Sequence, residues 1–150
     1  MLMAKHSIHI ARAPRQVFDF FIDFSQASRW RQYVRTMTPR EPGPIRVGSV
    51  IDVVFDVVGV TQRFELKVLA CDPPSLWRHR TNETEFFGSV EYRFDPEDGG
   101  TRVTLTIDAK PIGIYGWLAM PLLWLKRSQT YAQQLPQLKA AVETRSSTRR

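Results

Sequence analysis

Residues 117–142, WLAMPLLWLKRSQTYAQQLPQLKAAV, repeat an apolar pattern at the spacing of a helix. The leading members recur every seven residues and each is followed four residues later by a second member: Trp117, Trp124, Tyr131 and Leu138, then Pro121, Ser128, Leu135 and Val142. This spacing predicts one long helix whose stripe packs against a sheet. Because proline lacks an amide hydrogen, Pro121 should start or kink the helix, leaving residues 112–120 as a separate apolar turn. Pro136 should bend the axis.

Upstream of this stretch, the pattern changes to the two-residue alternation of strands. Apolar and polar residues alternate in six segments: 6–11, 51–57, 62–68, 76–81, 86–94 and 101–110. Turn-forming residues separate several of them, at 72–75 and 82–85. Residues 95–100 are the strongest hairpin signal, because their two glycines can supply the positive φ of a tight return. We therefore expect an α+β fold in which a curved sheet grips the long helix.

Two short helices are expected between the first strand and the rest of the sheet. Residues 14–22 carry apolar side chains three and four apart, and Pro14 suits the first turn of a helix. Ser25 is expected to cap a second short helix over residues 26–31. That helix should bring Trp30 to the start of the sheet.

The composition is that of one globular domain, with 150 residues, 43% hydrophobic and 24% charged. We expect this domain over residues 1–144, followed by a disordered basic tail over residues 145–150. Cys71 is the single cysteine, and residues 1–10 hold no apolar run long enough for a signal peptide, so we expect a cytoplasmic protein. The apolar run 112–125 is shorter than the ~20 residues that cross a bilayer.

The formal net charge is +6, and half of it lies on three arginines of the tail: Arg145, Arg149 and Arg150. A second group surrounds the predicted short helices: Arg29, Arg31, Arg35 and Arg40. We expect this second group to be solvated, and able to steer an acidic ligand or a membrane surface toward one end of the fold. No helix-turn-helix, zinc-finger or RNP-type motif accompanies the charge, so no specific nucleic-acid partner is expected. A transient membrane-surface contact is a further expectation, and the oligomeric state stays open.

The sequence carries no motif for covalent, phosphate or dinucleotide chemistry: G-x-S-x-G, the P-loop, the dinucleotide fingerprint and C-x-x-C are absent. His6 and His9 are three residues apart on a predicted strand, so they lie on opposite faces and cannot share a metal. Asp52 and Asp56 share a face, but it is the solvated one. We therefore expect neither a metal nor a cofactor.

Five polar residues are in phase with apolar positions that should point inward: Gln62, His79, Thr81, Tyr92 and Ser128. A mostly apolar space with a few hydrogen-bonding groups is typical of a small-molecule site, although each group could also be a satisfied member of a filled core. The register of residues 76–81 is open. We favour the register that places Trp77 and His79 inside, because the other register would bury Arg78 and Arg80 without acidic partners.

Several short motifs resemble a known superfamily: Ile8-x-Ile10-x-x-x-Pro14-x-x-Val17-Phe18-x-Phe20, Trp30, Gly48 before a strand, Pro73-Pro74, Thr101-x-Val103-x-Leu105 and Leu135-x-x-Leu138-Lys139-x-x-Val142-Glu143. They resemble the START-related (SRPBCC) superfamily, and more narrowly its bacterial polyketide cyclase/dehydrase and lipid-transport group. The resemblance implies a helix-grip fold. In that fold a seven-stranded curved antiparallel sheet wraps around a long C-terminal helix, with two short helices after the first strand.

The resemblance also implies an internal cavity for a lipid, a polyketide or another hydrophobic molecule. The residues expected to line it are Trp30, Phe55, Gln62, Phe64, Trp77, His79, Thr81, Tyr92, Leu105, Ile107, Trp124, Ser128 and Tyr131. Non-catalytic binding or transport is the favoured interpretation. The alternatives are a cyclase- or dehydratase-like enzyme, with His79 and Tyr92 as candidate catalytic residues, and a protein-interaction role in which the cavity is vestigial.

Overall fold

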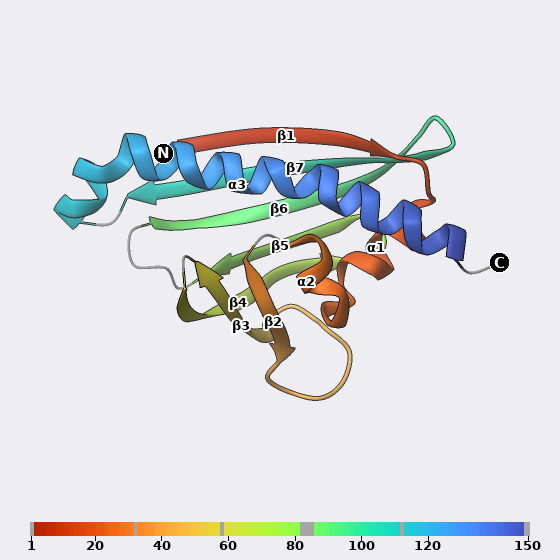
Figure 1. Cartoon of the computed structure of the whole chain (residues 1–150), viewed down its shortest axis with the longest axis horizontal. Helices are drawn as coiled ribbons and strands as arrows, with labels where there is room; N and C mark the ends of the chain where they lie inside the picture. The colour runs from red at the N-terminus through yellow and green to blue at the C-terminus, as the bar shows by residue number, and fades with distance from the viewer. Residues whose placement is uncertain (1, 32, 58, 82–85, 112, 149–150) are drawn as a thin grey trace.

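The computed structural model describes residues 2–31, 33–57, 59–81, 86–111 and 113–148, which form a seven-stranded antiparallel sheet crossed by one long helix (Figure 1). The strand order is β1-β7-β6-β5-β4-β3-β2. The strands are β1 Leu2–Ile10, β2 Val34–Pro39, β3 Val50–Val57, β4 Val60–Asp72, β5 Leu76–Thr81, β6 Phe86–Glu97 and β7 Gly100–Pro111. The helices are α1 Pro14–Phe21, the 3-10 turn η1 Phe24–Gln26, α2 Ala27–Trp30 and α3 Gly113–Thr148. The predicted α+β helix-grip fold is confirmed.

Six strands follow the alternation seen in the sequence, and β2 is the strand that the pattern did not mark. Only Met37 is buried among its six residues, and its pairing with β3 shifts between Val34 and Thr36. A strand at the sheet edge that buries one side chain has no two-residue period to detect. The first strand also begins earlier than predicted, at Leu2.

The short helices differ from the prediction in their caps. The predicted helix over 26–31 is the 3-10 turn η1 followed by the single turn of α2. Ser25 does not cap it, because its hydroxyl donates to Asp23 Oδ1 at 2.5 Å and Asp23 occupies the N-cap position of η1. Serine side chains near the start of a helix commonly form such local hydrogen bonds, and here the bond to Asp23 takes the place of a cap.

The hairpin over 95–100 is tighter than predicted. Strand β6 continues to Glu97 and β7 begins at Gly100, so the turn is Asp98–Gly99. Asp98 has φ 48° and Gly99 has φ 74°, so Asp98 rather than Gly100 supplies the second left-handed residue. Aspartate tolerates this conformation in two-residue turns. The predicted turn at 82–85 lies outside the described residues.

Helix α3 is continuous from Gly113 to Thr148, with both Pro121 and Pro136 inside it. Residues 113–120 are therefore helical rather than a separate turn, and residues 145–148 continue the helix that was expected to end in a disordered tail. A helix of this length spans about 54 Å at 1.5 Å per residue. The 12-residue strands β6 and β7 span only about 40 Å. The helix therefore extends past the sheet, as Figure 1 shows.

This difference in length divides the apolar stripe of α3. Leu135, Leu138 and Val142 are buried, and Trp124, Ser128 and Tyr131 are half-buried. Trp117 is 59% exposed and Pro121 is also exposed, so the prediction that the whole stripe faces the sheet is wrong for its first turns. No described helix is long and apolar enough to cross a membrane.

Helices α1 and α2 lie against the sheet beside the C-terminal half of α3 (Figure 1), and buried residues of all three helices join the core there. The Phe21 ring lies at its centre, with ring centroids 4.6 Å from Tyr92, 5.3 Å from Phe94, 5.6 Å from Trp30 and 5.7 Å from Trp77. Tilted and edge-on aromatic pairs of this kind contribute about 0.5–1.5 kcal/mol each beyond their buried area. The cluster joins helices α1 and α2 to strands β5 and β6.

Candidate functional site

A row of residues in direct register crosses the sheet beneath α3. His6 of β1 pairs with Leu105 of β7, Leu105 pairs with Tyr92 of β6, and Tyr92 pairs with Trp77 of β5. Partners in an antiparallel sheet point to the same face, so all four side chains face the helix. Leu105, Tyr92 and Trp77 are fully buried, whereas His6, on the edge strand, is half-buried.

His6 is a site residue that the sequence interpretation missed. Its Nε2 lies 3.2 Å from Ser128 Oγ, and this hydrogen bond joins β1 to α3. The signal was present, because His6 has the same strand parity as Ile8 and Ile10. His9 has the opposite parity, and its Nε2 bonds the backbone oxygen of Glu97 at 2.9 Å. The prediction that the two histidines cannot share a metal is consistent with this placement.

His79 and Trp77 point into the core, as the favoured register predicted. His79 is 2% exposed, and Trp77 Nε1 donates to His79 Nδ1 at 2.8 Å. A nitrogen that accepts a hydrogen bond carries no proton, so this contact favours the neutral ring with its hydrogen on Nε2. His79 pairs with Val90, one row along the sheet from Tyr92.

Arg31 is the largest departure from the sequence interpretation, which placed it among solvated surface charges. It follows α2 directly and is only 6% exposed. Its guanidinium carbon lies 4.2 Å from the centre of the Trp30 ring and 5.0 Å from that of Phe21. The other three arginines of the group behave as predicted at the surface: Arg29, Arg35 and Arg40. Arg31 differs because its guanidinium lies over the Trp30 and Phe21 rings of the aromatic cluster.

No carboxylate in the described part of the chain pairs with Arg31, and its Nε and Nη2 have no hydrogen-bond partner there. Burial lowers the pKa of its guanidinium, and the neighbouring phenols of Tyr92 and Tyr131 act in the opposite direction. Arginine nevertheless stays protonated in proteins. The interior therefore contains a positive charge that no described side chain neutralises.

Tyr92 and Gln134 extend this set of unpaired polar atoms. The Tyr92 hydroxyl is buried without a described partner, and burial raises its pKa, so the phenol is neutral near pH 7. Gln134 is 6% exposed and its Oε1 is also unpaired within the described residues. It lies three residues after Tyr131 and hence on the same face of α3. Trp30 Nε1 is a further buried donor without a described partner.

The other predicted lining residues lie at different depths. Leu105 and Ile107 are fully buried, and five more are half-buried: Phe55, Phe64, Thr81, Trp124 and Tyr131. The prediction for Gln62 is wrong, because it is exposed. Gln62 pairs with Phe55 close to the β3–β4 turn, where Val60 is also 55% exposed. Its strand parity is correct, but it lies too near the end of the sheet to be covered.

Acidic residues on the outer face of the sheet form surface ion pairs. Arg40 bonds Asp52 at 2.6 Å and Glu65 at 2.8 Å, and Arg35 lies 3.7 Å from Asp56. Asp52 and Asp56 are thus partly solvated and paired with arginines, as expected for an outer face. Among the described residues, no three potential ligands come together in a way that could hold a metal ion.

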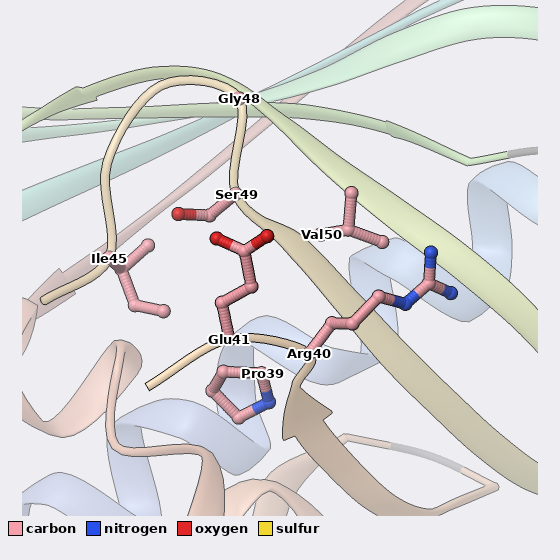
Figure 2. A pocket seen from close by; sticks show the side chains of 7 residues that line it. All are labelled: Pro39, Arg40, Glu41, Ile45, Gly48, Ser49 and Val50. Carbon is pink, nitrogen blue, oxygen red and sulfur yellow. The ribbon is translucent and has the colours of Figure 1, made fainter. Parts of the chain in front are cut away.

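A separate surface pocket of about 190 Å³ lies at the loop between β2 and β3 (Figure 2). Glu41, Ile45 and Ser49 point into it, whereas the Arg40 side chain points away, toward its acidic partners. The Ser49 hydroxyl already accepts a hydrogen bond from the Arg46 amide at 3.0 Å. None of the described residues that line this pocket has a buried unpaired polar side-chain atom, so the interior beneath α3 is the stronger candidate site.

Comparison with known proteins agrees with this fold. A family model described as polyketide cyclase/dehydrase and lipid transport matches residues 1–143. The chain is similar to the crystal structure of TTHA0849 from Thermus thermophilus, with 21% identity, 97% of this chain and 99% of that chain covered, and a TM-score of 0.78. No curated protein matches the chain.

Two further structures have the same architecture. The Zhui aromatase/cyclase from Streptomyces sp. R1128 is 20% identical, covers 97% of this chain and 95% of its own, and has a TM-score of 0.78. Ara h 8.0201 is 13% identical, with 95% and 98% covered and a TM-score of 0.74. At these identities the similarity establishes the fold alone.

The hydrogen bond between Trp77 and His79 predicts that replacing Trp77 by phenylalanine destabilises the protein more than the same replacement of another buried tryptophan. Trp77→Phe removes the donor to His79 Nδ1, and an unsatisfied buried acceptor costs about 1–3 kcal/mol. Trp30→Phe is the matched control, since Trp30 is equally buried and its Nε1 has no described partner. We expect Trp77→Phe to lower the free energy of unfolding in urea by about 1–2 kcal/mol more than Trp30→Phe. Equal losses would show that the bond contributes nothing.

Proposed function

Because the chain belongs to the polyketide cyclase/dehydrase and lipid transport family, we propose that it binds a hydrophobic small molecule between the sheet and α3. The observation that carries the proposal is the group of buried polar atoms without described partners, on Trp30, Arg31, Tyr92 and Gln134. Native interiors satisfy nearly all such atoms, so a group of them points to a bound molecule that completes the hydrogen bonding. The apolar side chains around them suit the rest of such a molecule.

The route to this interior is proposed along β1 and the middle of α3. Inward-facing residues there are only half-buried, including His6 on the strand and Trp124, Ser128 and Tyr131 on the helix. Inward-facing residues of β6 and β7 in the same rows are fully buried. An apolar molecule that enters beside Ser128 would complete the burial of these half-exposed side chains.

Ser128 tests this location. We expect Ser128→Trp to raise the Kd of the neutral fluorescent probe N-phenyl-1-naphthylamine at least tenfold, because an indole would occupy the proposed space. Overpacking a filled core costs about 1–3 kcal/mol, whereas filling free space should cost less. Gln129→Trp is the control, since Gln129 is the next residue and is exposed. Native mass spectrometry of freshly purified protein would identify any natural occupant.

Two results would contradict the proposal. The first is a wild-type protein that neither takes up the probe nor carries an extractable molecule. The second is a large fall in Tm for Ser128→Trp with unchanged probe affinity, which would show that Ser128 belongs to ordinary core.

An enzyme of the cyclase or dehydratase type is the alternative, favoured by the similarity to an aromatase/cyclase and by the burial of His79 in the same interior. We rank it second because His79 Nδ1 is already engaged by Trp77, and Tyr92 is a neutral phenol that is poorly suited to act as a base.

His79→Gln separates the two functions. Glutamine keeps an acceptor for Trp77 Nε1, so we expect the affinity for the molecule extracted from the protein to change less than about tenfold, or about 1.4 kcal/mol. General acid–base catalysis by His79 would instead show as a fall in turnover of about 10²–10⁴ with binding retained, because glutamine cannot exchange a proton near neutral pH. Isothermal titration and product analysis on the same samples distinguish these outcomes.

A transient membrane contact is a second candidate role, and the exposed start of α3 favours it. The α3 overhang is the apolar face formed by Ile114, Trp117, Leu118, Leu122 and Leu125, each more than half exposed. Tryptophan among leucines on a helix is typical of a surface that lies in a membrane interface. The exposed Lys110 precedes this helix, and the net charge of +6 suits an anionic surface.

The overhang is tested with two acidic substitutions. We expect Leu118→Asp with Leu122→Asp to reduce co-sedimentation with phosphatidylcholine vesicles containing phosphatidylglycerol at least fivefold. Gln129→Asp with Gln133→Asp changes the charge equally at exposed polar positions and should have a much smaller effect. The membrane role is wrong if the wild type does not co-sediment with vesicles but forms a dimer, and the double leucine variant is a monomer. In that case the surface serves self-association.

A further inference from the structure

Arg31 points to the chemistry of the ligand. Building on the proposed function, we propose that the protein selects a hydrophobic molecule with a carboxylate end group, and that Arg31 binds this carboxylate. The charge of Arg31 is buried, and no ion pair neutralises it among the described residues. Removing a guanidinium from water is unfavourable unless an opposite charge accompanies it. Stacking on Trp30 and Phe21 compensates only part of that cost.

The geometry of the unpaired atoms matches a carboxylate. Nε–H and Nη2–H point from the same edge of the planar guanidinium, and together they form the side-on fork that donates two parallel hydrogen bonds to one carboxylate. These are the two Arg31 atoms without a described partner. An alcohol or a ketone could use only one of them, so the fork favours an anionic two-oxygen group.

The surrounding polar atoms complete the polar end of the site. The Tyr92 hydroxyl is protonated because burial raises its pKa, so it can donate to an anionic oxygen, as can Trp30 Nε1–H. Gln134 Oε1 can accept from a hydroxyl on the ligand. Tyr131, whose charged form would interact with Arg31, is the other titratable group that faces it.

The spacing of residues along α3 indicates how long the apolar part of the ligand is. From Gln134 the helix returns to Ser128 over six residues, about 9 Å at 1.5 Å per residue. Tyr131 lies between them and is half-buried. A carboxylate at Arg31 would therefore place an apolar body about 9 Å long beside Tyr131, with its far end near Ser128 and His6.

The test compares decanoate with 1-decanol, which have the same chain and differ in the end group. Each displaces the neutral reporter N-phenyl-1-naphthylamine in competition at pH 7.5. We expect the wild type to bind decanoate at least tenfold more tightly than 1-decanol. Arg31→Met should abolish this preference while changing 1-decanol affinity less than threefold. Arg29→Met is the matched control, because Arg29 lies two residues earlier on α2, is exposed and donates to Gln26 Oε1. It should keep the preference.

The Tm gives a second measurement, and a purely structural arginine would not produce the pattern expected here. Removal of an unpaired buried charge should raise the Tm of ligand-free protein, so Arg31→Met should melt a few degrees higher than the wild type. Decanoate should raise the Tm of the wild type more than 1-decanol does, whereas the two should raise the Tm of Arg31→Met by the same amount. Arg31→Lys keeps the charge without the fork and should show an intermediate preference.

The outcomes separate the two proposals. If the reporter and both probes fail to bind the wild type, the proposed function is wrong and this inference falls with it. If 1-decanol binds as tightly as decanoate to the wild type, or if the preference survives Arg31→Met, the protein binds apolar molecules but Arg31 is not the carboxylate anchor. If Arg31→Met fails to fold, Arg31→Lys takes its place, and an undiminished preference for decanoate in that variant would overturn the assignment of Arg31.

Discussion

The contact of the Phe21 ring with four aromatic neighbours is the interaction on which the rest of the structure depends. It is the point at which α1, α2, β5 and β6 meet, since Trp30, Trp77, Tyr92 and Phe94 come from three of those elements and Phe21 from the fourth. The cluster lies beside the C-terminal half of α3 and forms part of the hydrophobic core. Trp30, the last residue of α2, supplies one of these rings, and Arg31 follows it directly as the C-cap of the helix.

Arg31 lies against this aromatic cluster. The aromatic cluster supplies two ring faces for the guanidinium, so a residue one position beyond a four-residue helix enters the core instead of the solvent. A charge held there without a described counter-ion costs stability, and proteins commonly accept such a cost where it serves binding. If Arg31 binds a carboxylate as proposed, the stability of the protein and its choice of ligand depend on the same side chain.

The shared fold shows the architecture of this chain, whereas only the residues of the site can indicate its function. The sheet order and the position of α3 agree with structures of 13–21% identity, so many different sequences support the same architecture. An architecture shared at such low identity does not specify which polar atoms lie inside it. Function therefore has to be argued from Arg31, Tyr92, Gln134 and their neighbours, because the shared fold does not by itself specify a function.

Periodicity in the sequence was sufficient for the elements and for the faces of most residues. The two-residue alternation predicted six of the seven strands and placed Trp77, His79, Tyr92, Leu105 and Ile107 inside, because side-chain direction along a strand is a local property. Burial depth and contacts between residues far apart in the sequence are not local properties, and the tertiary structure alone decided them. Gln62 has the inward parity but lies too near a turn to be covered, and Trp117 continues the stripe of a helix that is longer than its sheet. His6 meets Ser128 across 122 positions of sequence, and Arg31 is buried because distant aromatic residues converge beside it, which no spacing rule contains.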